Sequence, residues 1–233
     1  MEFRNGESGL HVLHIQTITE MLLRQLVQKE NNRYALSKEQ IRMITTASAL
    51  HDIGKISIPD EILNKPGRLT AEEFAVIKGH SMAGANMLSE LPLDQKEEPL
   101  VKTAYEICRW HHERYDGGGY PDGLKGEEIP VSAQVVALAD VYDALTSERC
   151  YKDAYSHEKA IEMILAGQCG AFNPLMLECL LDISSSLKKK MGYKSKERYE
   201  QTDLSDIASR FHDFEMDSSE KIVQQLELSL IHI

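Results

Sequence analysis

The stretch that decides the fold is Ala49-Leu50-His51-Asp52-Ile53-Gly54-Lys55-Ile56, where a histidine and an aspartate stand side by side after an apolar run. Adjacent helical residues point about 100° apart, so His51 and Asp52 reach one centre only near a helix end. We expect Gly54 to end the helix and let the chain turn, which brings Lys55 within reach of the same centre. An imidazole with a carboxylate suits Fe, Mn or Zn better than Ca.

Taken alone, the pair is weak evidence for a metal site, because most adjacent His and Asp residues are a cap and a surface polar group. It gains weight from other metal-ligand types along the chain: His11, His80, His111, His112 and Asp140. By itself, His11 would be interpreted as a surface residue. Asp140 interrupts an apolar run that starts after Pro130, so its helix should be buried. A buried carboxylate needs a positive partner, and a metal ion is the natural candidate.

Length and charge restrict the classes of function. The 233 residues suffice for one large domain or a domain with an extension, and 42% hydrophobic residues is ordinary for a soluble globular protein. The net charge of −11 argues against binding a nucleic-acid polymer, although local cations could hold a small phosphate ligand. No apolar run is long enough for a membrane span, and the N-terminus has no signal-peptide core. The four cysteines lack CxxC spacing, and we interpret them as reduced thiols in a cytoplasmic protein: Cys108, Cys150, Cys169 and Cys179.

Apolar periodicity predicts a mostly helical chain, with at most a short hairpin of strands. From Leu10 to Val27 the pattern is that of a long amphipathic helix with His11 in its first turn. Glu7 lies four residues earlier, on the same face if the helix starts early enough. Further helices are predicted over residues 99–110, from Pro130, from Ser156 and from Pro174.

Two capping boxes mark the starts of other helices. Ser37 with Gln40 opens a helix that leads to His51, and Thr70 with Glu73 opens one that reaches His80.

A glycine-dense stretch follows the histidine pair: Tyr115-Asp116-Gly117-Gly118-Gly119-Tyr120-Pro121-Asp122-Gly123. Neither a helix nor a strand interior accommodates so many glycines. A flexible linker fits poorly, because Tyr, Asp and Pro are interleaved instead of Ser. We therefore predict a specific loop whose backbone amides can approach a phosphate or a metal cluster.

Taken in order, these motifs resemble the HD-GYP family, a branch of the HD phosphohydrolase superfamily. The matching segments are His51 to Lys55, Lys65-Pro66-Gly67, His80, the run from His111 to Pro121, and Ala139 to Ala144. The resemblance covers roughly residues 6–183. It implies an all-α, HD-type helical bundle with a buried multi-metal site. It also implies hydrolysis of cyclic di-GMP to pGpG or GMP in bacterial signalling, with two or three Fe or Mn ions.

The resemblance implies a role for each matching residue. The metal ligands would be Glu7, His11, His51, Asp52, His80, His111, His112 and Asp140. Asp52 would bridge two ions, and Glu7 matches the extra carboxylate of a three-metal arrangement. Lys55 is assigned to catalysis with Asp52, because it matches a lysine beside the scissile phosphate. Contacts to the cyclic dinucleotide substrate are expected from Arg149, Lys152, Asp143 and Tyr120.

Elementary chemistry agrees with those assignments. Paired metal ions lower the pKa of bound water and clamp the attacking and leaving oxygens of a phosphodiester. A lysine ammonium adds positive charge where negative charge develops. Two departures from the family pattern, His14 in place of Arg and Asn173 in place of Asp, do not fall on a predicted ligand.

Two other functions stay open. The chain could act on another cyclic dinucleotide or nucleotide, or it could be a catalytically silent module that binds a ligand or partner. The complete ligand set and Lys55 argue against a silent module.

Composition divides the chain near Leu187. We expect residues 1–187 to form the catalytic domain and residues 188–233 a C-terminal extension, a basic linker followed by a helix. The apolar stripe of Ile222, Leu226 and Leu230 could pack on the bundle, pair in a homodimer or fray, and we favour association. Because the first ligand helix starts almost at once, we expect this domain to be part of a larger signalling protein.

Overall fold

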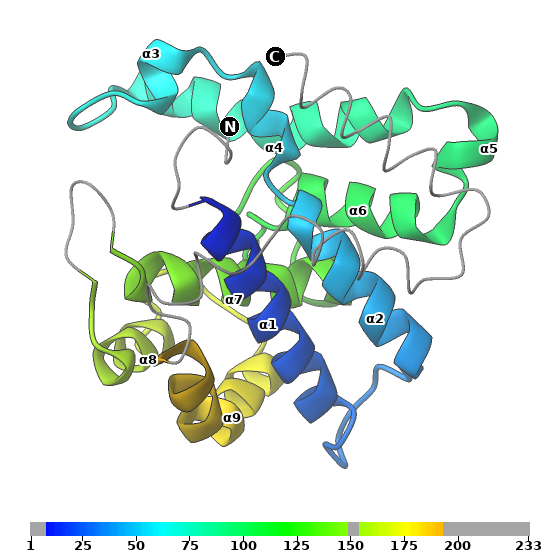
Figure 1. The fold of residues 1–233 in the computed structure, drawn as a ribbon, viewed down its shortest axis with the longest axis vertical. Coiled ribbons are helices and arrows are strands. Elements are labelled where there is room, and N and C mark those ends of the chain that lie inside the picture. The colour runs from blue at the N-terminus through cyan, green and yellow to red at the C-terminus, as the bar shows by residue number, and fades with distance from the viewer. Residues whose placement is uncertain (1–7, 149–153, 193–233) are drawn as a thin grey trace.

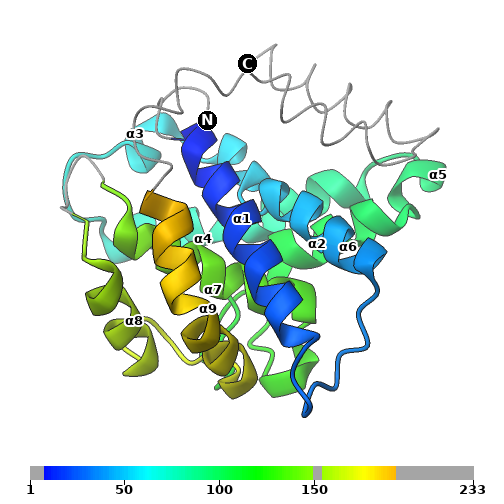
Figure 2. The same ribbon diagram turned by 60° about the horizontal axis from the view of Figure 1, so that its bottom comes forward.

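The structure, a computed structural model, describes residues 8–148 and 154–192, and throughout this part the chain forms only helices and loops (Figure 1). The all-α fold predicted from the sequence is confirmed. Helix α1 (Ser8–Leu26) crosses the molecule and packs against three others: α2 (Lys38–Ala47), α7 (Val131–Thr146) and α9 (Pro174–Gly192). Figure 2 shows α9, α1 and α2 side by side.

The predicted amphipathic pattern of α1 is what fixes this central position. Ile15, Ile18, Leu22 and Leu26 recur every three or four residues along one face, and all are fully buried. The N-terminal end of this helix carries His11, which places that side chain at the edge of the core. The helix ends at Leu26, and turns followed by irregular chain lead to Ser37.

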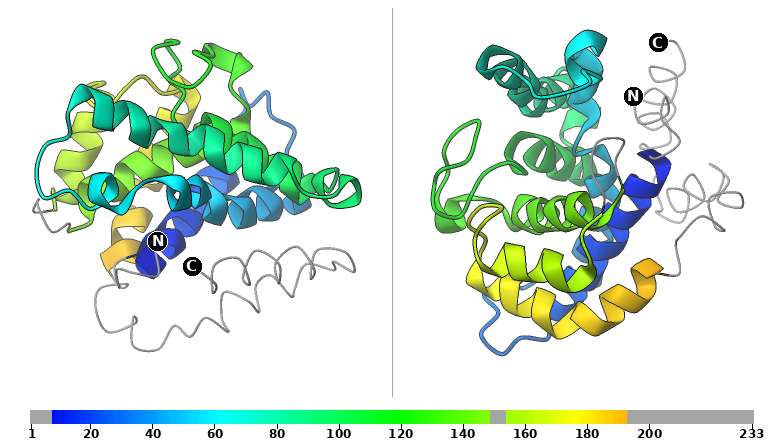
Figure 3. Two further views of the ribbon diagram at one scale, coloured as in Figure 1. Left: turned by 90° about the horizontal axis from the view of Figure 1, so that it is seen from above. Right: turned by 90° about the vertical axis from the view of Figure 1, so that its left-hand side faces the viewer.

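A second group of helices covers one end of the bundle. Helix α4 (Ala71–Ser89) and helix α6 (Pro99–Trp110) lie side by side, joined through the short α5 (Leu93–Lys96), as Figure 3 shows from above. The remaining elements are η2 (Ser48–Leu50), η3 (Ile53–Ser57), α3 (Asp60–Leu63), η4 (Gly126–Glu128) and α8 (His157–Leu165), the last of which contacts α7 and α9.

Both predicted capping boxes are present. The Ser37 hydroxyl accepts a hydrogen bond from the Gln40 amide, and the Gln40 side chain accepts one from the Ser37 amide. Thr70 and Glu73 make the same reciprocal pair. Each cap of this kind stabilises its helix by about 1 kcal/mol.

Gly54 acts through packing, and our expectation that it ends a helix is wrong. It lies inside η3, and a Cβ atom there would come within 1.9 Å of the His80 carbonyl oxygen and 2.4 Å of the Gly84 amide nitrogen. Both neighbours are backbone atoms of α4, so only glycine allows η3 to lie directly on this helix. The close contact brings the segment that carries Asp52 against the segment that carries His80.

Helix α7 is buried almost all round, as its composition predicts. Val135, Leu138 and Ala139 are fully buried, and Asp140 stands at the end of this apolar run. Helix α9 continues past the buried Leu187 to Gly192, so the boundary expected at residue 187 falls within a helix. The stripe from Ile222 to Leu230 lies outside the described residues.

Asn173, which departs from the family pattern, fits its position well. Its side-chain oxygen accepts the Leu175 amide at the start of α9, as an aspartate could. Its amide group also donates to the Gln134 side-chain oxygen at 2.8 Å and the Tyr34 hydroxyl at 2.9 Å, which a carboxylate could not do. In the described part of the chain, no helix has the length and apolar character needed to cross a membrane.

Candidate metal centre

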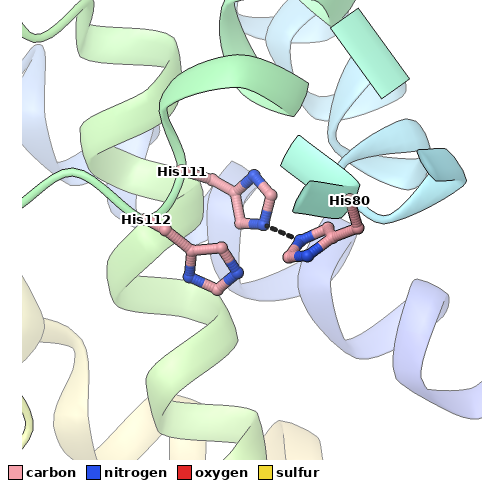
Figure 4. Close-up of side chains that lie close together, drawn as sticks. All are labelled: His80, His111 and His112. Carbon is pink, nitrogen blue, oxygen red and sulfur yellow. Dashed lines mark hydrogen bonds between the residues drawn. The ribbon is translucent and has the colours of Figure 1, made fainter. Parts of the chain in front are cut away.

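Two sets of metal-ligand side chains converge where these helices meet. One set is His80 of α4 with His111 and His112, which follow α6 (Figure 4). The other is His11 of α1, His51 after η2, and Asp140 of α7. Within each set the ligand atoms lie within 4.8 Å of one another, a spacing at which one ion can contact all three.

Asp52 joins the two sets. Its Oδ2 lies 3.3 Å from His51 Nε2, and its Oδ1 lies 3.2 Å from His80 Nε2 and 3.9 Å from His111 Nε2. Each carboxylate oxygen therefore faces a different set of ligands. The bridging role that the family resemblance implies for Asp52 needs a carboxylate in such a position.

Local backbone contacts fix which nitrogen of each histidine faces the centre. The Nδ1 atoms of His51, His80 and His111 lie 2.7–2.9 Å from the carbonyl oxygens of Ser48, Ile77 and Ile107, respectively. A carbonyl oxygen only accepts, so each Nδ1 carries the proton and each Nε2 presents a lone pair. Such contacts are the ones that orient metal-binding histidines in proteins.

The resulting lone pairs point at one another. His11 Nε2 and His51 Nε2 are 3.3 Å apart, and His80 Nε2 and His111 Nε2 are 3.4 Å apart. Two unprotonated nitrogens at this distance repel each other unless a cation lies between or beside them. The donor set of imidazoles and carboxylates therefore fits divalent metal ions.

Burial keeps His111 and His112 neutral. It lowers the pKa of His111 to about 4, with a further contribution from the neighbouring His51, and it holds the pKa of His112 well below its usual value, helped by His111. Burial opposes ionisation of Asp52, but Lys55 and His51 outweigh it and hold the pKa of this carboxyl well below its usual range. Neutral imidazoles and an ionised carboxylate are the states that metal ligands require.

Lys55 lies at the centre, as its position in the sequence predicts. Its ammonium forms an ion pair with Oδ2 of Asp52, and its side chain is 34% exposed. The lysine can therefore face both the bridging carboxylate and a molecule that enters from solvent.

Asp143 was expected to contact substrate, and the structure shows that this expectation is wrong. Its Oδ2 accepts a hydrogen bond from His11 Nδ1 at 2.6 Å. Its Oδ1 accepts from His14 Nδ1 at 2.6 Å and from the Ser147 hydroxyl at 2.9 Å. The side chain is only 1% exposed, so a ligand cannot reach it. The Asp143 carboxylate orients His11 instead. The sequence signal for this role is that Asp143 follows Asp140 by about one helical turn, which places both on the same side of α7.

The glycine-rich loop is held by specific contacts, as predicted, but its amides serve another purpose. The buried Glu113 carboxylate accepts the amides of Asp122 and Gly123. A Cβ at Gly119 would lie 2.4 Å from the Glu113 Cα, so the loop packs backbone against backbone there. The group that reaches the centre is the Tyr120 ring, which stacks on His112 with ring centroids 4.8 Å apart. Three predicted site residues, Glu7, Arg149 and Lys152, lie outside the described residues.

Comparison with known families agrees with this geometry. The model of the HD domain family matches residues 10–172, more than half of the chain. The chain belongs to the HD domain family. The family predicted from its motifs is thereby confirmed.

Several curated proteins resemble the chain over most of its length. It is 41% identical over 182 residues to a Vibrio cholerae protein named "Cyclic di-GMP phosphodiesterase", covering 78% of this chain and 37% of that protein. It is 38% identical to "3'3'-cGAMP-specific phosphodiesterase 2" of the same organism, covering 78% and 32%. A solved structure of Bd1817, an HDG"Y"P protein from Bdellovibrio bacteriovorus, shares the fold with a TM-score of 0.56 and 22% identity, covering 75% of this chain and 51% of that one. The chain thus spans less than half the length of these curated relatives.

Proposed function

We propose that this HD domain is a metal-dependent phosphodiesterase that hydrolyses cyclic di-GMP to pGpG or GMP. The observation that carries the proposal is the pair of ligand sets joined by Asp52, with Lys55 beside them. The relatives named for this activity support the choice of substrate. A silent binding module is disfavoured, because every predicted ligand in the described residues faces the centre.

The residues divide the chemistry between them. When bound, metal ions would supply an activated water and neutralise charge on the phosphoryl oxygens. The two ligand sets would hold these ions, and Asp52 would keep them together. The Lys55 ammonium adds a further positive charge next to Asp52, where charge develops on the phosphate.

The identity of the metal is part of the proposal. Five imidazoles with two carboxylates, taken from the two ligand sets and Asp52, favour Fe or Mn over a pure oxygen-ligand ion such as Ca. We propose two ions, with a third if Glu7 contributes its carboxylate. Arg149 and Lys152 remain proposed contacts to the substrate phosphates, and Tyr120 a proposed contact to the substrate.

A second substrate deserves the same test. Three relatives named as 3'3'-cGAMP-specific phosphodiesterases are 38%, 34% and 31% identical to this chain, against 41% for the cyclic di-GMP relative. The two cyclic dinucleotides differ in one base, so the metal centre itself would not distinguish them.

The wider context is also proposed. Since the chain covers less than half of its relatives, we propose that this domain works within a larger signalling protein of the cytoplasm. The residues after 192 would associate with the bundle or with a second copy in a homodimer.

The proposal is tested by metal analysis and turnover of the same anaerobically prepared sample. We expect about two or three Fe or Mn ions per chain. We also expect conversion of cyclic di-GMP to pGpG or GMP, measured by chromatography. Asp52→Ala should abolish turnover and deplete metal. Lys55→Ala should lower turnover by about 10²-fold or more while metal remains bound, because its charge acts on the phosphate.

Lys159→Ala is the matched control for Lys55→Ala, since Lys159 forms an exposed ion pair with Glu162 on α8. This control should leave turnover unchanged. A metal content of one ion per chain, or full activity of the Lys55 variant, would contradict the assigned roles.

A further inference from the structure

One cation close to the metal centre has no part in the chemistry described so far. Lys78 lies on α4, two residues before the ligand His80. Its ammonium is 5.1 Å from the centroid of the Tyr120 ring and 4.8 Å from the centroid of the Phe74 ring. Tyr120 in turn stacks on the ligand His112. Lys78 is thus one aromatic ring away from the metal centre.

The partners of Lys78 differ from those of other lysines in the structure. Lys29, Lys65 and Lys188, for example, each form an ion pair with a carboxylate. Lys78 lies over two aromatic faces instead, and no carboxylate of residues 8–148 or 154–192 is within ion-pair distance of it. Its positive charge is only partly compensated there, since a cation–π contact at an exposed site is weak.

The aromatic partner Phe74 is also unusual. Its side chain is 47% exposed, and it stands on the same face of α4 as Lys78, one helical turn away. An exposed aromatic ring next to an uncompensated cation matches the two parts of a nucleotide, a flat base and a phosphate.

We infer that Lys78, together with Phe74, is a specificity-determining element of the substrate site. This inference rests on the proposed function. A cyclic dinucleotide has two phosphodiester groups and two bases, and the metal centre with Lys55 acts on only one phosphodiester. Lys78 binds the phosphodiester that is not being hydrolysed, and the Phe74 ring stacks on a base. A substrate with a single phosphodiester gains nothing from the Lys78 ammonium, because it has no second phosphodiester to place there.

The experiment compares two substrates on each variant: cyclic di-GMP, and bis(p-nitrophenyl) phosphate as a simple phosphodiester. Lys78→Gln should raise KM for cyclic di-GMP about tenfold, with kcat changed less than twofold and the simple substrate unaffected. Phe74→Ala should raise the same KM several-fold, and Phe74→Tyr should restore it. Lys78→Arg, which keeps the charge, should retain most of the affinity.

The matched control is Lys159→Gln on α8, which should leave both substrates unchanged. A merely structural role for Lys78 would slow both substrates together and lower the melting temperature. Equal effects on both substrates, or a KM for cyclic di-GMP within twofold of the parent, would overturn the inference.

Failure of the proposed function gives a different result, because the parent would then hydrolyse the simple phosphodiester but no cyclic dinucleotide. Calorimetric binding of cyclic di-GMP and 3'3'-cGAMP to the parent and to Lys78→Gln would then decide. Weaker binding by the variant supports the inference, and absent or equal binding overturns it.

Discussion

At the scale of single residues, the carboxylate of Asp143 determines how His11 meets the metal centre. The hydrogen bond from His11 Nδ1 to Asp143 leaves Nε2 unprotonated and turned toward His51. His14 donates to the other carboxylate oxygen, so both acceptor sites carry a charge-assisted bond. Asp143 thus positions the set of His11, His51 and Asp140, and it makes no contact with the set of His80, His111 and His112.

Asp143→Asn tests this role, since an amide offers one oxygen where two imidazole N–H groups need acceptors. We expect metal affinity at the set of His11, His51 and Asp140 to fall about 10–100-fold, as for other outer partners of metal-binding histidines. Metal titration should therefore show one weakened ion and one normal ion per chain. Asp182→Asn, which removes an exposed partner of Lys29, should bind both ions normally. Uniform loss of both ions would mean that Asp143 only supports the fold.

The histidines of the centre also predict how stability depends on pH when metal is removed. Burial lowers the pKa of His111 to about 4, below the unfolded value of about 6.5, and it lowers the pKa of His112 in the same direction. Between these values the unfolded chain binds more protons than the folded one, so stability is lost as the pH falls from about 6.5 toward 4. His157 acts with the same sign.

Urea unfolding of the chelator-treated protein at pH 7.5 and at pH 5 measures this effect. The midpoint should be lower at the acidic pH, and His111→Asn should reduce the difference. An unchanged or higher midpoint at pH 5 would show that these imidazoles are not buried in the neutral form.

At the scale of elements, the contact between η3 and α4 places Asp52 against His80, and it depends on Gly54. Gly54→Ala would drive a methyl group into the His80 carbonyl oxygen and the Gly84 amide, which are backbone atoms that cannot move aside cheaply. We expect a loss of stability of about 3 kcal/mol or more together with loss of metal.

Gly79→Ala on α4 is the control for this substitution, because a Cβ at Gly79 meets nothing within 4 Å. It should stabilise the helix by about 0.5–1 kcal/mol and leave metal content unchanged. Thermal melts with metal analysis of both variants check the pair. Similar effects of the two substitutions would rule out the packing role of Gly54.

Local rules predicted the elements well and the contacts between them poorly. The capping boxes at Ser37 and Thr70 and the apolar faces of α1 and α7 depend on residues a few positions apart, so the sequence reveals them directly. The role of Gly54 depends on a helix that starts about twenty residues later, and that of Asp143 depends on α1. No local pattern distinguishes a glycine that ends a helix from one on which another backbone packs.

At the scale of the whole molecule, the metal centre connects parts of the chain that are distant in sequence. Its candidate ligands come from α1, the turn after η2, α4, the end of α6 and α7. The motif resemblance predicted which residues are candidate ligands. Only the folded structure shows that they form two sets, one on each side of Asp52. Since ions bound here would link the central bundle to the α4–α6 pair, metal removal should affect the stability of the entire domain.

Chelation of the purified protein tests this coupling. Binding that is saturated about 100-fold above its dissociation constant stabilises the folded state by about 2.7 kcal/mol. For a domain of this size that corresponds to a decrease of roughly 5–10 °C in melting temperature on metal removal. Helix content by circular dichroism should change little, because the buried core that joins α1, α2, α7 and α9 is made of apolar side chains and includes no candidate ligand. Return of Mn or Fe should restore the parent, while Asp52→Asn should show a much smaller shift in both directions. A metal-containing sample whose melting temperature is insensitive to chelation would show that the ions do not join these helices.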